Sequence, residues 1–144
     1  MKIAVVGLGY VGLSNAVLLA QNHEVVAVDI TPERVAMVNA RKSPIEDREL
    51  EEYLATRALD LTATTDLEAA VKGATFVIVA TPTDYDPVEN FFDTSSVDTV
   101  IRKVLAADPE AVTVIKSTIP VGYVTEMRAA LGSDRILFSP EFLR

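Results

Sequence analysis

The 144-residue sequence predicts an α/β fold in which helices cover both faces of a doubly wound parallel sheet of about six strands. Strand-like and helix-like segments alternate along the chain, and the strand-like segments are apolar throughout rather than at every second residue. Such strands are buried on both faces, as in a parallel sheet with crossover helices on either side. We find no solenoid repeat, low-complexity segment or linker, so residues 1–144 are expected to form one domain.

The first half of the chain supplies three strands and four helices. Short runs rich in β-branched residues predict the strands, whereas broader apolar faces and helix-start signals predict the helices. Thr31 is expected to cap one helix with its hydroxyl, followed by Pro32 at the first helical position. The predicted strands are 2–6, 24–30 and 60–63, and the predicted helices are 10–21, 31–40, roughly 47–58, and 66–73 closed by Gly73.

The second half continues the alternation. The predicted strands are 75–81, 111–117 and 135–139, the predicted helices are 94–106 and 121–132, and residues 82–93 and 140–144 are predicted to be a loop and a tail. The carboxylates in the loop lack the ligand spacing and central glycine of an EF-hand, so no metal site is predicted.

Composition excludes several kinds of function. The chain has no cysteine, so it offers no disulfide, thiolate metal site or thiol nucleophile, and its one histidine, His23, excludes a multi-histidine metal site. A net charge of −8 disfavours nucleic acid as a partner. No apolar stretch reaches the ~20 residues of a membrane helix. The start lacks the features of a signal peptide, so a cytoplasmic location is expected.

The stretch VVGLGYVGLS, residues 5–14, predicts a dinucleotide-binding fold of the Rossmann type. Its glycines follow a predicted strand and open a predicted helix, and the acidic residue Asp29 ends the next strand, 22 residues after Gly7. Gly7 is expected to permit the tight turn, Gly9 to let the backbone approach a pyrophosphate, and Gly12 to let the helix pack closely on the sheet.

The helix that follows the glycines explains how an acidic protein can hold a phosphate. Backbone amides near Tyr10 and Val11 are expected to bind the pyrophosphate, with the helix dipole behind them. Asp29 is expected to accept hydrogen bonds from the adenosine ribose and to repel a 2′-phosphate, which favours NAD over NADP. Arg34 leaves alternatives open, because it could hold a 2′-phosphate, cover the ribose or adenine, or lie in solvent.

Hydroxyl and carboxyl side chains follow three other predicted strands, at the sheet edge where ligands bind in such folds. Thr83 and Thr118 could contact cofactor or substrate, or they could only cap local turns. Glu141 could act as a base, or it could be a surface acid. Lys116 could face the cleft or simply end its strand, and His23 is expected at the surface of a helix–strand turn.

Six segments, in this order, resemble the bacterial UDP-glucose 6-dehydrogenases. They are MKIAVVGLGYVGLS, VDITPERV, SPIEDRELEEYL, VIVATPTDYDP, VIKSTIPVG and ILFSPEFLR. The resemblance covers the whole chain, but it corresponds only to the family's N-terminal, NAD-binding domain. It implies oxidation of the 6-hydroxyl of UDP-glucose to a carboxylate with two NAD, through an aldehyde and a cysteine thioester.

The resemblance also implies roles for individual residues. The glycine loop, Asp29, Arg34 and Thr83 would hold NAD. Thr118 would lie beside the nicotinamide and position the catalytic water, and Glu141 would be the acid/base group for thioester hydrolysis. The sugar nucleotide would be cradled by Glu141 and by the backbone of Phe142, Leu143 and Arg144.

Other parts of the family's machinery are not expected in this chain. The catalytic cysteine, lysine and asparagine of the family lie later in its sequence, and a further family glutamate would follow Arg144. The family's central helix and C-terminal substrate domain are therefore expected to be absent, and the chain alone is expected to be inactive. The resemblance also implies that the full-length enzyme is a dimer. The alternatives are the cofactor domain of a dehydrogenase for UDP-N-acetylmannosamine or GDP-mannose, and an NAD-binding module without chemistry.

Overall fold

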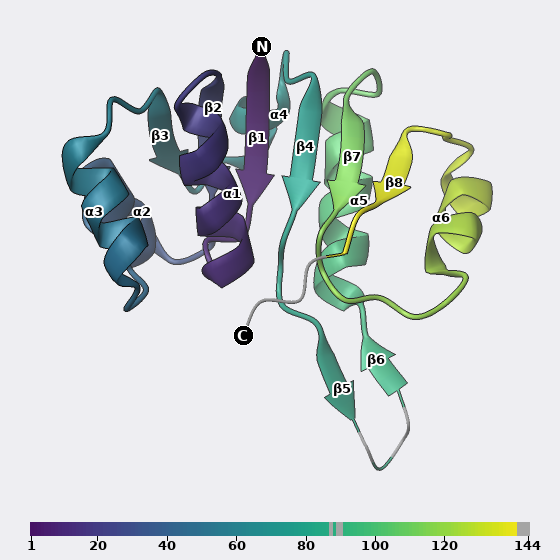
Figure 1. Cartoon of the computed structure of the whole chain (residues 1–144). Helices are drawn as coiled ribbons and strands as arrows, with labels where there is room; N and C mark the ends of the chain where they lie inside the picture. The colour runs from purple at the N-terminus through teal and green to yellow at the C-terminus, as the bar shows by residue number, and fades with distance from the viewer. Residues whose placement is uncertain (87, 89–90, 141–144) are drawn as a thin grey trace.

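The computed structural model describes residues 1–86, 88 and 91–140, and its main feature is a parallel sheet of six strands (Figure 1). The strand order is β3-β2-β1-β4-β7-β8, and every neighbouring pair is parallel. The strands are β1 (Lys2–Val6), β2 (Glu24–Val28), β3 (Leu61–Thr64), β4 (Phe76–Val79), β7 (Val112–Ile115) and β8 (Ile136–Phe138). The predicted doubly wound sheet is therefore confirmed.

Helices cover both faces of this sheet, as predicted. The helices are α1 (Tyr10–Ala20), α2 (Pro32–Asn39), α3 (Arg48–Thr56), α4 (Leu67–Val71), α5 (Ser95–Ala107) and α6 (Tyr123–Leu131). Side chains of β1 point alternately to the two faces, so Val5 joins one buried cluster with α1, α2 and α3. Val6 joins a second cluster with α4, α5 and α6. Each face thus has its own apolar core.

The strand order reverses between β1 and β4. The chain runs from β1 outwards to β3, and then returns to the other side of β1 to form β4, β7 and β8. Loops that leave the carboxyl ends of β1 and β4 consequently diverge, which opens a crevice at that edge of the sheet. The glycine loop lies at the end of β1, so the topology alone places it at the crevice.

Two sequence-based predictions about local structure were wrong. Residues 82–93 contain an antiparallel hairpin of β5 (Asp84–Asp86) and β6 (Phe91–Asp93), which projects beyond the carboxyl ends of the sheet (Figure 1). Strands of three residues are too short to show a periodic pattern. Thr31 occupies the N-cap of α2, but its hydroxyl makes no capping bond. Its backbone N–H donates instead to Asp29 Oδ1, at 2.9 Å.

Several boundaries also differ from the predicted ones. β4 and β7 each end two residues earlier than expected. Helix α6 begins at Tyr123, after Gly122 in a left-handed conformation with φ of 85°. His23 lies in the predicted turn but is half-buried. In the described residues, no helix is both long and apolar enough to cross a bilayer.

Replacing Thr113 by valine is expected to stabilise the fold. Thr113 lies in β7 with no exposed surface, and its hydroxyl has no hydrogen-bond partner among the described residues. A buried hydroxyl without a partner costs free energy, so Thr113→Val should raise the free energy of unfolding by about 1 kcal/mol in urea denaturation. Thr62→Val, at an exposed site in β3, is the control; an equal gain there would contradict the explanation.

Candidate dinucleotide-binding site

The backbone leaves no room for a side chain at Gly7, in the turn after β1, or at Gly12, in the first turn of α1. Gly7 has φ of 100°, and a Cβ atom there would lie 2.6 Å from the carbonyl oxygen of Ala80, just past β4. A Cβ atom on Gly12 would lie 1.6 Å from the carbonyl oxygen of Gly7. Helix α1 therefore packs against the turn itself, which agrees with the predicted close packing of the helix.

Gly9 is different, because the space around it is open. Its φ of −78° suits any residue, and a Cβ atom there would meet no atom within 4 Å. Gly9 is the N-cap of α1, and the first hydrogen bond of the helix runs from Leu13 N to Gly9 O. The amides of residues 10–12, which precede Leu13, have no acceptor within the helix, and the helix dipole adds positive potential there. This open amide cluster suits a pyrophosphate.

Asp29 has a structural role in addition to the predicted one. Its Oδ2 accepts a hydrogen bond from Leu8 N at 2.8 Å, and its Oδ1 accepts one from Thr31 N at 2.9 Å. The carboxylate thus fixes the glycine loop to the end of β2. A carboxylate has about four lone-pair sites, so two amide bonds leave capacity for the hydroxyls of a ribose.

Arg34 extends from the first turn of α2 towards the same loop. Its Nη1 donates to the carbonyl oxygen of Leu8 at 3.4 Å. Leu8 N is bonded to Asp29, so the guanidinium and the carboxylate lie on the two sides of one loop residue. Arg34 is exposed, so a contact with a 2′-phosphate, a position over the ribose or adenine, and a solvated position all stay open.

A cavity of about 410 Å³ extends from the glycine loop across the carboxyl ends of β2 and β4, and we term it the adenosine pocket. Gly7 and Asp29 form one part of its wall, and apolar groups from Ile30, Leu67 and Val100 form another. Polar groups for a ribose and apolar surface for a base therefore adjoin each other. This arrangement fits the adenosine half of a dinucleotide.

Hydroxyl side chains from the loop after β4 and from α5 line this pocket, and the cofactor contact predicted for Thr83 stays a prediction. Thr83 is half-buried but does not line the pocket, whereas Thr81 and Ser96 do. Ser96 Oγ donates to Pro82 O at 2.7 Å, which ties the loop after β4 to the start of α5. The sequence showed hydroxyls after this strand, but not which of them faced inwards.

The loop after β7 is held against the loop after β4. Ser117 is 7% exposed, and its Oγ donates to Thr81 O at 2.6 Å. Thr118 follows directly; it is half-buried and lies outside the lining of the adenosine pocket. Lys116 Nζ donates to Ser139 Oγ at 3.1 Å, so this lysine extends towards the end of β8. Glu141, Phe142, Leu143 and Arg144 lie outside the described residues.

Tyr10 contributes its backbone amide to the loop, while its side chain contacts α3. Its hydroxyl donates to Asp47 Oδ2, and Asp47 also caps α3 by accepting from Leu50 N at 2.9 Å. The shared hydrogen bond raises the pKa of Tyr10 and lowers the pKa of Asp47. Val11 is half-buried in the first turn of α1. No group of three or more potential metal-ligating side chains occurs in the described ranges.

The sequence profile of the UDP-glucose/GDP-mannose dehydrogenase family, NAD binding domain, matches residues 1–144. The chain belongs to this family. The glycine loop, Asp29 and the adenosine pocket are thus parts of an NAD-binding domain, and the Rossmann-type expectation is confirmed.

Known proteins extend the comparison. The chain is 51% identical to UDP-glucose 6-dehydrogenase of Streptococcus pneumoniae and 42% identical to that of Campylobacter jejuni, in both cases over its full length. It spans only 36% and 37% of those proteins. The solved UDP-D-ManNAc dehydrogenase of Pyrococcus horikoshii superposes with a TM-score of 0.85 at 30% identity, over 100% of this chain and 37% of that one.

Alanine at Gly12 is expected to lower the stability of the fold, whereas alanine at Gly9 is expected to weaken NAD binding. Gly12→Ala places a methyl group on the Gly7 carbonyl, so it should lower the free energy of unfolding by about 3 kcal/mol or more. Gly9→Ala should change the free energy of unfolding by less than about 1 kcal/mol. It should nevertheless weaken NAD binding about tenfold or more, because the methyl group occupies space beside the free amides. Urea unfolding and calorimetric titration measure the two effects, and a stable Gly12→Ala variant would contradict the packing argument.

Proposed function

We propose that this chain is the NAD-binding domain of a UDP-glucose 6-dehydrogenase. The proposal that the chain binds NAD rests on the open amide cluster at Gly9, which lies beside the Asp29 carboxylate and the adenosine pocket. The substrate part is supported by 51% identity to the Streptococcus pneumoniae enzyme across all 144 residues.

NAD, when bound, would supply the acceptor for hydride from the substrate. The amides at the start of α1 would hold its pyrophosphate, and Asp29 would accept from the ribose hydroxyls. Asp29 also repels a 2′-phosphate, so NAD is favoured over NADP. Thr83 is proposed to touch the cofactor from the loop after β4.

The residues proposed for chemistry follow β7 and β8. Ser117 fixes the loop after β7, and the next residue, Thr118, is proposed to position a water through its hydroxyl. Glu141 is proposed to exchange protons with that water, and the backbone of Phe142, Leu143 and Arg144 to contact the sugar nucleotide. The chain has no cysteine, so a covalent thioester would need a nucleophile from a further domain.

A second candidate is the cofactor domain of an enzyme for another nucleotide sugar. It is favoured by the fold similarity to the Pyrococcus horikoshii UDP-D-ManNAc dehydrogenase, and the solved GDP-mannose dehydrogenase of Pseudomonas aeruginosa is similar at 29% identity with a TM-score of 0.83. Both identities are well below 51%, so UDP-glucose remains the preferred substrate.

Asp29→Asn is expected to reduce the preference for NAD over NADP. The wild-type chain should bind NAD at least about tenfold more tightly, because a 2′-phosphate close to a carboxylate is repelled. The variant keeps one carbonyl acceptor for the loop but loses the charge, so the ratio of the two dissociation constants should fall at least about fivefold. Calorimetric titration with both dinucleotides measures this ratio. Loss of loop structure alone would weaken both ligands equally, and an unchanged ratio would contradict the assigned role.

A chimera tests the proposed activity. This chain would replace the matching N-terminal 36% of the Streptococcus pneumoniae enzyme, and NAD reduction with UDP-glucose would be followed. Turnover is expected, and Thr118→Ala or Glu141→Gln should lower kcat about a hundredfold, the usual scale for lost acid/base assistance. Thr125→Ala and Glu126→Gln, both exposed on α6, are the matched controls. A folded, NAD-binding chimera without turnover would overturn the UDP-glucose proposal.

A further inference from the structure

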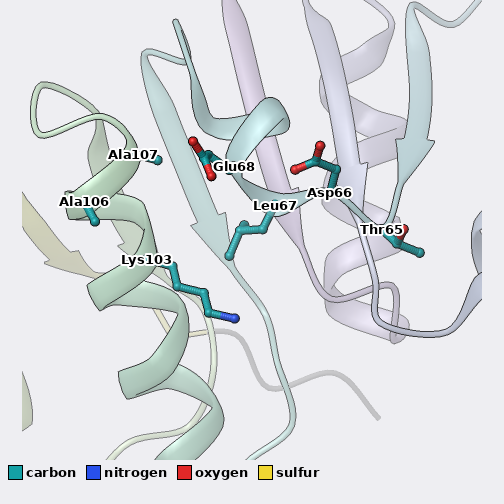
Figure 2. Close-up of a pocket in the computed structure, with 7 residues that line it drawn as sticks. All are labelled: Thr65, Asp66, Leu67, Glu68, Lys103, Ala106 and Ala107. Atoms are coloured by element: carbon teal, nitrogen blue, oxygen red, sulfur yellow. The ribbon is translucent and has the colours of Figure 1, made fainter.

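A second cavity adjoins the adenosine pocket on the α4–α5 side of the sheet. It has a volume of about 500 Å³ and lies between residues 65–68 at the start of α4 and the last turns of α5 (Figure 2). Thr65, Leu67 and Lys103 line both this cavity and the adenosine pocket. The two cavities therefore share a wall made of these three residues, and we refer to the new one as the α4–α5 cavity.

Of the side chains in this shared wall, Leu67 packs against the apolar core on this face of the sheet, whereas Lys103 is exposed. Leu67 and Lys103 extend into the space between the two helices from opposite sides, and the Lys103 amine points towards the carboxyl ends of the strands (Figure 2). In the described part of the chain, the Lys103 ammonium has neither an ion-pair partner nor a hydrogen-bond partner. A long side chain without a polar partner can change rotamer without losing such a contact. The wall can therefore yield to a ligand.

The adenine base would lie against this wall. Pyrophosphate and ribose are assigned to the glycine loop and Asp29, so the base is left with the apolar surface of Ile30, Leu67 and Val100. Leu67 belongs to the shared wall. A group attached to the edge of the base thus has a route past Lys103 into the α4–α5 cavity.

The far side of the α4–α5 cavity carries carboxylates. Asp66, just before α4, and Glu68 on α4 both line it, and Ala106 on α5 lines it as well (Figure 2). Glu68 forms an exposed ion pair with Lys72 at 3.4 Å, and Asp66 Oδ1 accepts from Ala69 N at 3.1 Å. The lining carries these two carboxylates against one ammonium, that of Lys103, and each carboxylate keeps further acceptor sites, so a substituent that ends in a hydrogen-bond-donating amine is favoured.

We propose that the α4–α5 cavity is an extension of the adenosine pocket that accepts a substituent on the exocyclic amine of adenine, with Lys103 as the movable side chain of the shared wall. The ligand class is an adenine dinucleotide that carries a short, amine-terminated chain on N6. The proposal rests on the NAD binding assigned above.

The test is a calorimetric titration of the chain with NAD and with N6-(2-aminoethyl)-NAD. The wild-type dissociation constants should agree within about threefold, because the added chain enters existing space and orders at most one side chain. Ala106→Phe fills the α4–α5 cavity from an exposed position outside the adenosine pocket. It should leave NAD binding unchanged and weaken the N6-substituted probe about tenfold, the effect of blocking a small subsite. Ala130 is exposed on α6, so the control Ala130→Phe should change neither dissociation constant.

Different results separate this proposal from the cofactor assignment. If Ala106→Phe weakens binding of N6-(2-aminoethyl)-NAD but not of NAD, the result supports the α4–α5 cavity as an extension of the adenosine pocket. Wild-type binding of NAD without binding of the probe, or equal effects of Ala106→Phe on both ligands, would overturn the extension alone. A folded wild-type chain that binds neither ligand would overturn the NAD assignment together with it.

Discussion

The close approach of α1 to the turn after β1 is the constraint on which the site depends. Gly12 lies so near the Gly7 carbonyl that a single methyl group would overlap it, and Gly7 in turn lies against the backbone of Ala80. These contacts lock together the ends of β1 and β4 and the start of α1. Because this unit is rigid, the free amides after Gly9 have a fixed direction before any ligand arrives.

Asp29 connects this unit to the next strand. Its two carboxylate oxygens accept amides from Leu8 and Thr31, so one residue holds the glycine loop, the end of β2 and the entry to α2. Across the crevice, Ser96 and Ser117 hold the loop after β4 through carbonyl groups of Pro82 and Thr81. These polar side chains therefore also help to build the walls of the adenosine pocket, which shares Thr65, Leu67 and Lys103 with the α4–α5 cavity.

Charge explains why the anion site uses the backbone. The chain carries a net charge of −8, so its long-range field opposes the approach of a phosphate. Backbone amides and a helix dipole act only at short range and add no net charge. Arg34 supplies one local cation through its position beside Leu8. In the proposed function, selectivity for NAD depends on Asp29, because its negative charge would oppose a 2′-phosphate while its lone pairs would accept from a ribose.

The sequence by itself determined the alternation of elements, the parallel sheet and the cofactor loop, because buried strands, helix starts and glycine spacing are local patterns. It could not show that Asp29 bonds Leu8 N, that Thr81 rather than Thr83 lines the adenosine pocket, or that residues 84–93 include a hairpin. Those features depend on where separate segments meet. Only the tertiary structure decided them, since a side chain's partner is set by packing between strands and helices that lie far apart in the chain.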